Sequence, residues 1–228
     1  MTTVNISNYD GKNVVWTGSS WAMNSAPSEF LVGYGIDSTE QKMGSVMLFH
    51  NSIANVIALP YKCNIEEAHL VLVPNNNEGN GPVNSRITGG LEGGSWNTIA
   101  AYQASRGTVV GGANNNYITT IQVTWDNIPT QTAQVAHNSP DIKTVIQKLV
   151  NQVGWNINYN IPIYWDDHEA RGTQLSFHRR RAKTYNLSPP VVLSVTYVSY
   201  PTDPLLRVVG IARNFATGVT GKVGKYQL

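Results

Sequence analysis

Along most of the chain, hydrophobic and polar residues partly alternate in short runs separated by turn-forming residues. The runs are rich in β-branched and aromatic residues, and Pro, Asn and Gly stand between them at fairly regular intervals. This pattern is typical of strands, and its spacing favours an antiparallel sandwich or jelly roll over a parallel sheet with crossover helices. We therefore expect strands in the segments GSVMLFHNSI, NIEEAHLVLVP, SRITGGLEG, NNYITTIQVTW, NIPIYW, TQLSFH and PPVVLSVTYV.

One segment, HNSPDIKTVIQKLVNQVGW, has the period of a helix instead. Ser139 suits an N-cap, Pro140 suits the first helical position, and Asp141 suits the positive end of the helix dipole. Gly154 suits the stop. The sequence predicts one amphipathic helix over about residues 139–153, which closes an end of the sandwich with an apolar stripe made of Ile142, Val145, Ile146, Leu149, Val150 and Val153.

The two ends of the chain differ from its middle. Residues 1–28 are polar and contain Trp16 and Trp21, which predicts an N-terminal arm or edge segment held by two aromatic anchors. Residues 29–198 carry the strand pattern, so we expect a single β-jelly-roll domain there. Residues 199–228 contain a short apolar run that is too small to bury its own side chains, which predicts a C-terminal docking extension.

The order of elements in the second half of the chain resembles a known family, the DNRLRE-type β-jelly-roll modules. In those modules a strand ending in V-x-W leads to a polar segment, an S-P-D helix that ends in G-W, and a final strand with L-x-V-x-Y. This chain has VTW at 123–125, SPD at 139–141, GW at 154–155 and LSVTY at 193–197. The stretch IALPYKCNIEEAHLVLVP also looks like a strand pair of that family. The resemblance covers residues 44–198.

The family occurs in bacterial surface proteins and in tailed-phage particles, and its motifs are not catalytic. The resemblance therefore implies a non-enzymatic structural protein on the outer surface of a phage particle, as a capsid decoration or cement protein or as a tail-appendage component. It also implies other virion proteins as partners, with a homo-oligomer such as a trimer, and no cofactor. The N-terminus lacks a basic start followed by an apolar run, so we expect synthesis in the host bacterial cytoplasm without a signal peptide.

Composition narrows the classes of partner. The formal net charge of +2 is too small to create the field that nucleic-acid binders use. No run is long and apolar enough to span a bilayer, so neither nucleic acid nor a membrane is expected as a partner. The single cysteine, Cys63, excludes an internal disulfide, and stability must come from packing.

The densest group of titratable residues is WDDHEARG at 165–172. Its spacing is not that of an EF-hand, and adjacent carboxylates point in different directions, so we expect a solvated loop, with an oxygen-ligand ion site as the alternative. His50, His69, His137 and His178 are not paired at zinc spacing. No nucleophile or phosphate-loop motif appears, and no catalytic or metal site is predicted.

Two further sets of residues are candidates for contacts. A carbohydrate-binding module or adhesin for a host glycan is the alternative function, and its sugar platform would be formed by Trp96, Tyr164 and Trp165. Assembly contacts are expected where aromatic, apolar or Arg residues stand in the terminal segments and the basic cluster, namely at Trp16, Trp21, Arg179, Arg180, Arg181, Leu205, Leu206, Val208, Val209, Phe215 and Tyr226.

Overall fold

The computed structural model describes residues 1–16, 21–24, 27–37, 39–54, 56–78, 81–90, 118–166 and 178–199. Its helix and strands are β1 (Thr2–Trp16), β2 (Trp21–Asn24), β3 (Glu29–Asp37), β4 (Thr39–His50), β5 (Ser52–Ile53), β6 (Val56–Ile57), β7 (Asn64–Leu72), β8 (Val83–Gly90), β9 (Ile118–Ile128), β10 (His137–Asn138), α2 (Lys143–Val150), β11 (Asn160–Asp166), β12 (His178–Lys183) and β13 (Val192–Val198).

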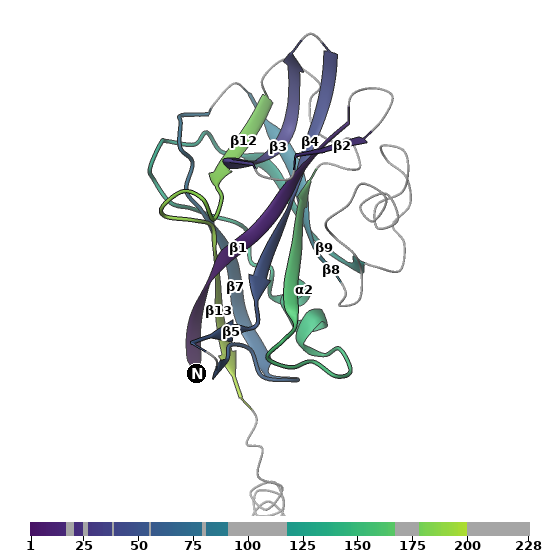
Figure 1. The fold of residues 1–228 in the computed structure, drawn as a ribbon, viewed down its shortest axis with the longest axis vertical. Helices are drawn as coiled ribbons and strands as arrows, with labels where there is room; N and C mark the ends of the chain where they lie inside the picture. Colours follow the sequence, from purple (N-terminus) through teal and green to yellow (C-terminus); the bar gives the residue numbers. More distant parts are fainter. Residues whose placement is uncertain are drawn as a thin grey trace, which may run out of the picture.

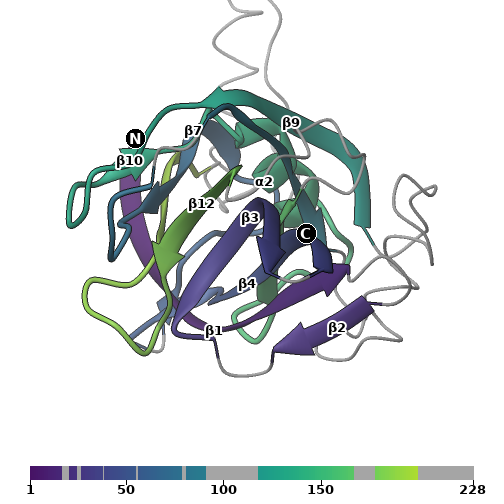
Figure 2. The same ribbon diagram turned by 90° about the horizontal axis from the view of Figure 1, so that it is seen from above.

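Within the described ranges, all strands except β5 and β6 belong to one 11-stranded antiparallel sheet. Its main path runs β10-β7-β13-β1-β4-β11-β8-β9, and β3 connects β4 to β12 beside that path. The sheet curls on itself so that its two halves face each other across the core (Figure 1), and Figure 2 shows the strands surrounding that core. The predicted all-β, jelly-roll-like sandwich is confirmed.

β1 is the strand that joins the two halves of the sheet. Its residues 2–7 pair with β13, and its residues 8–16 pair with β4 after a bulge near Asn8 and Asp10. The N-terminal segment predicted as an arm is therefore a central strand, and the predicted boundary at residue 28 is wrong. The segment contains few apolar residues that face the core, such as Ile6 and Val14. Its composition is therefore mostly polar and does not indicate a central strand.

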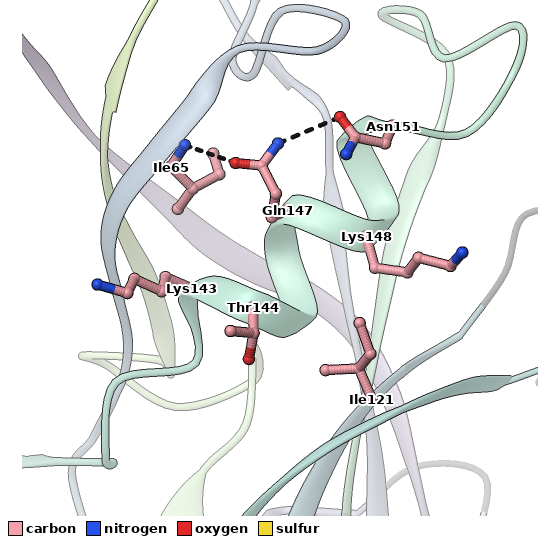
Figure 3. A pocket seen from close by; sticks show the side chains of 7 residues that line it. All are labelled: Ile65, Ile121, Lys143, Thr144, Gln147, Lys148 and Asn151. Carbon is pink, nitrogen blue, oxygen red and sulfur yellow. Dashed lines mark hydrogen bonds between the residues drawn. The ribbon is translucent and has the colours of Figure 1, made fainter.

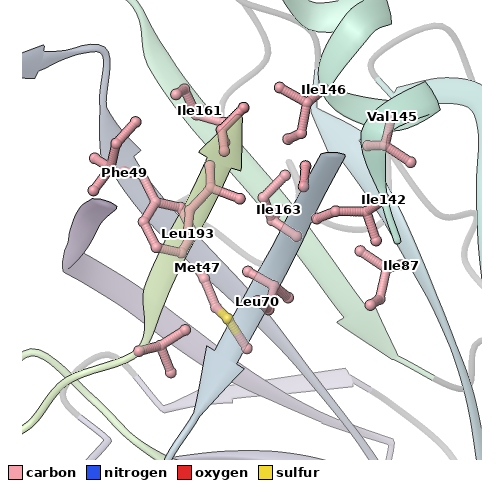
Figure 4. Packing of buried hydrophobic residues seen from close by; sticks show 14 of the residues in the cluster. Met47, Phe49, Leu70, Ile87, Ile142, Val145, Ile146, Ile161, Ile163 and Leu193 are labelled. Carbon is pink, nitrogen blue, oxygen red and sulfur yellow. The ribbon is translucent and has the colours of Figure 1, made fainter. Parts of the chain in front are cut away.

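The core lies between the two halves and is filled by aliphatic and aromatic side chains. Met47 and Phe49 of β4, Leu70 of β7 and Leu193 of β13 are fully buried there (Figure 4). α2 adds Ile146 and its neighbours Ile142, Val145, Leu149 and Val150, which are also buried. At about 25 cal/mol per Å² of apolar surface, such burial is the main source of stability for a domain without a disulfide.

α2 closes the open side of the curl, where it contacts β7 of one half and β8 and β9 of the other. The predicted helix is confirmed, but its bounds are shorter: it begins at Lys143 and ends at Val150. Ser139 is not the N-cap, because its Oγ accepts a hydrogen bond from Leu70 N at 2.9 Å. Val153 lies beyond the helix and is 90% exposed, so its assignment to the buried stripe is wrong.

Candidate functional site

One end of the sandwich gathers the beginning of β1, the end of β13 and the beginning of β7. Thr2 pairs with Tyr197, and Val198 pairs with Asn64. In Figure 1 this end is at the bottom, where the N-terminus is marked beside the β5–β6 hairpin. We call the surface formed here by Met1, Ile53, Val56, Tyr61 and Val153 the terminal end.

Buried polar contacts fix the loops of the terminal end. The side chain of Asn51 is fully buried, and its Nδ2 donates to Leu59 O at 3.2 Å and to Asn156 O at 3.0 Å. Its Oδ1 accepts from Leu59 N at 2.8 Å. Trp155 Nε1 donates to the same Leu59 O at 2.8 Å. These bonds join the β5–β6 hairpin to the turn after α2, so the exposed residues on both are held in place.

Five of the six exposed large apolar side chains in the described part of the chain belong to the terminal end. Val153 is 90% exposed, Val56 is 64% exposed, and Met1, Ile53 and Tyr61 are also exposed. Val135 is the one other exposed large apolar side chain in the described part of the chain. It lies beyond the far end of β7, in a turn whose Gln134 N donates to Pro74 O at 2.9 Å. Apolar side chains gathered on one surface are typical of protein interfaces.

A groove of about 320 Å³ lies next to the terminal end, on the outer face of α2. Ile65 of β7 and Ile121 of β9 form its apolar walls, and the helix contributes Thr144 and Gln147 with Lys143, Lys148 and Asn151 (Figure 3). Lys143 and Lys148 point toward opposite ends of the groove. The site therefore combines aliphatic walls with a lysine at each end, of which Lys143 is already paired with Asp141, with Nζ 3.7 Å from Oδ2. Such a site suits a peptide that carries apolar side chains and a carboxylate, with Lys148 as the cation.

The predicted basic cluster is not a basic patch. Arg180 is 1% exposed, and its guanidinium donates to the carbonyl oxygens of Ile128 and Gly81 at 2.7 and 2.9 Å. Arg181 pairs with both Glu78 and Glu29, and its Nη1 lies 2.6 Å from Glu29 Oε2. Arg180 is thus a core residue and its assignment to assembly contacts is wrong, because alternate residues of β12 face inward.

Arg179 is also paired within the chain, since its Nε lies 3.6 Å from Glu78 Oε2. Arg179 and Arg181 line a polar pocket of about 210 Å³ together with Glu29 and Asn13. Because two carboxylates balance the two guanidinium groups, the pocket has little net charge. The sequence could not show this compensation, since Glu29 and Glu78 are distant from residues 179–181 in the chain.

The predicted glycan platform is not formed by the residues that the structure describes. Trp165 is fully buried, and its Nε1 donates to Ser85 Oγ at 3.0 Å. Tyr164 is buried on the opposite face of β11. Neither ring presents a face to solvent, so their assignment as sugar contacts is corrected to packing. Trp96 lies outside the described residues.

The segment 165–172 is described only at its beginning. Asp166 is buried, and its Oδ1 lies 3.6 Å from Arg86 Nε, which makes it part of a buried ion pair rather than a solvated loop. Residues 167–172 lie outside the described ranges. In the part of the chain that the structure describes, no three His, Cys, Asp or Glu side chains are grouped as metal ligands.

The histidines of the described residues have separate roles. His50 stacks on Tyr9 with ring centroids 3.5 Å apart. His69 Nδ1 lies 2.7 Å from Ser139 O, and its Nε2 lies 3.0 Å from Glu67 Oε1. Partial burial lowers the pKa of His69, but the contact with Glu67 and the other acceptors outweighs it, so the net effect is a raised pKa.

Several predicted contacts cannot be placed. The side chains of Trp16 and Trp21 are not described, although both residues lie in paired strands. The predicted contacts in the C-terminal extension, Leu205, Leu206, Val208, Val209, Phe215 and Tyr226, lie outside the described residues. Sequence reasoning missed Ile53, Val56 and Tyr61, because it placed Ile53 in a strand and did not single out the other two.

Comparison with known proteins gives no assignment: no family model matches the chain, and no curated protein matches it. Among the described residues, no helix is long and apolar enough to cross a membrane.

Proposed function

We propose that this chain is a non-enzymatic structural protein of a tailed-phage particle, exposed on the outer surface, which docks on other particle proteins through its terminal end. The observation that carries the proposal is the gathering of exposed apolar side chains at that end. The sequence resemblance to jelly-roll modules supplies the phage context. The C-terminal extension follows Ser199, which comes immediately after β13 at this same end.

Docking by this end is physically reasonable because its loops are already ordered. The Asn51 contacts hold the β5–β6 hairpin against the turn that carries Val153, so little conformational entropy is lost when a partner covers them. Val56 and Val153 lose unfavourable contact with water at the same time. These two residues are therefore the first to test.

The first experiment is quantitative mass spectrometry of particles pelleted from the source culture. A copy number similar to that of the major capsid protein supports a decoration or cement role, whereas a low copy number beside tail proteins supports a tail appendage. Absence of the chain from particles rejects the proposal. Glycan-array binding by the purified protein would then test the carbohydrate-binding alternative.

The surface itself is tested by paired variants. Replacement of Val56 and Val153 by Asp places carboxylates at the terminal end and should reduce incorporation into particles without changing the thermal unfolding midpoint. Val135→Asp is the matched control, because Val135 is also an exposed valine but lies at the opposite end of β7. Equal incorporation of both variants would show that the terminal end is not the docking surface.

A further inference from the structure

The groove on the outer face of α2 has apolar walls, which contact water unless another segment covers them. Ile65 is buried toward the core but borders the groove, and Ile121 is only partly buried. The long side chains of Lys143 and Lys148 extend along the outer face (Figure 3). A segment of extended chain with one or two aliphatic side chains is of the size that a groove of about 320 Å³ accepts.

The C-terminal extension begins beside this groove. Ile65, which lines the groove, pairs directly with Tyr197 of β13, so only β7 separates the end of β13 from α2. Neighbouring strands lie about 4.8 Å apart. The four steps from Ser199 to Asp203 span up to about 14 Å when extended. Residues 200–202 are thus long enough to carry the chain across β7 to the groove wall formed by Ile65.

The residues that would arrive there have suitable chemistry. Asp203 is the only acidic residue in 200–228, and Leu205 and Leu206 follow it closely. Pro201 and Pro204 favour extended backbone in the residues that precede them. The geometry points to a contact within one molecule: we propose that residues 203–206 occupy the α2 groove, with the two leucines against Ile65 and Ile121 and Asp203 beside a lysine.

Connection through the chain favours this contact over the same contact between molecules. A short linker gives an effective concentration on the order of millimolar, so even a weak apolar contact is populated. The inference concerns the molecule alone and does not depend on the proposed function. If the contact forms, the first residues of the extension are held against α2. Residues 207–228 would then leave from the helix rather than from the end of β13.

Cysteine cross-linking in the full chain tests the contact. Thr144 is exposed and lines the groove, so the double variant Thr144→Cys with Leu206→Cys should form a disulfide within one molecule under mild oxidation. The native Cys63 is buried and does not compete. Val135→Cys with Leu206→Cys is the control and should not cross-link. A disulfide-linked dimer, or no cross-link at all, would overturn the proposal.

Limited proteolysis gives a second readout that leaves the groove unaltered. Trypsin cleaves after Arg207, next to the docked residues, and docking should slow that cleavage. Replacing Leu205 and Leu206 by Ser, which removes the apolar contacts without placing a carboxylate beside the cleavage site, should accelerate cleavage after Arg207 by about tenfold, because cleavage follows the population of the undocked state. Cleavage after Arg213 serves as the internal reference. An unchanged ratio of the two rates would count against the contact.

Discussion

Asp141 Oδ1 accepts a hydrogen bond from Ala68 N at 3.0 Å, although the two residues are 73 positions apart in the chain. The bond belongs to a series along the outer edge of β7. Leu70 N donates to Ser139 Oγ at 2.9 Å, and Ile65 N donates to Gln147 Oε1 at 2.8 Å. An exposed strand edge invites pairing with other chains. The segment around α2 therefore covers this edge with its polar side chains while its apolar face fills the core.

Gln147 tests this role, because its amide both accepts from Ile65 N and donates to Cys63 O at 2.9 Å. Gln147→Ala should lower the free energy of unfolding by about 1 kcal/mol, since two backbone groups of the β7 edge lose their partner. Lys148→Ala, at the next position on the helix surface, should change it by less than about 0.5 kcal/mol. Urea unfolding measures both, and equal losses would contradict the role of Gln147.

Ile146 lies on the buried face of α2, whereas Val153 lies beyond the end of the helix and is exposed to water. Ile146→Asp should prevent folding, because a carboxylate would replace a fully buried side chain, and Ile146→Ala should cost about 2–5 kcal/mol. Val153→Asp should leave the unfolding midpoint nearly unchanged, since Val153 is 90% exposed. Retention of a cooperative melt by Ile146→Asp would show that the helix is not part of the core.

These results show which parts of the fold follow from sequence. β7, β9, β11 and β13 could be predicted because their runs are apolar and bounded by turn residues. The role of Ser139 could not, because a serine before a helix suits an N-cap whether or not Leu70 N lies nearby. β1 was missed for a similar reason: its pairing depends on residues near the other end of the chain, and local composition carries no sign of them.

The candidate site was less predictable than the fold. Tyr164 and Trp165 are adjacent aromatic residues, but both are buried because β11 is covered on its two faces. The exposed valines of the terminal end have no local signature, since exposure depends on how the sheet ends. Only tertiary structure distinguishes Val56 and Val153 from the buried valines that share their local pattern.

Arg180 should be intolerant of a conservative change. Its guanidinium donates to Ile128 O, Pro129 O and Gly81 O, and it is buried. A lysine lacks the planar arrangement of donors, so Arg180→Lys should destabilise the protein by more than about 2 kcal/mol. Arg179→Lys is the control and should cost less than about 1 kcal/mol, because Arg179 is partly exposed. Thermal unfolding of both variants measures the two losses of stability, and equal losses would contradict the role given to Arg180.

The rate at which the Cys63 thiol is alkylated should distinguish folded from unfolded protein. Burial raises the pKa of the Cys63 thiol to about 11, so the folded protein holds little thiolate at pH 8. Alkylation by iodoacetamide at pH 8 should therefore be slow in the native protein and fast in urea. Because the folded pKa is raised, stability should also fall as pH rises from about 9 to about 11. Rapid native alkylation would contradict this environment.

His69 should make stability depend on pH near neutrality. Its pKa is raised in the folded protein, where Nε2 contacts Glu67, so its contribution is fully present below its ordinary pKa and is lost as pH rises through the raised value. The difference in unfolding free energy between the parent and His69→Gln should shrink over that range. An NMR titration of the His69 ring measures the pKa directly, and an unshifted value would contradict the structure.

The pairing of Thr2 with Tyr197 has a consequence for how the chain acquires its fold. β1 is synthesised before β13, yet residues 2–7 of β1 acquire their neighbour only after residues 192–198 have been made. Until β13 has been made, the backbone of residues 2–7 has no strand partner on that side. Closure of the sheet thus depends on contacts between residues that are far apart in the sequence. Proteins dominated by such contacts fold slowly. This protein should therefore fold slowly, on a timescale of about milliseconds to seconds.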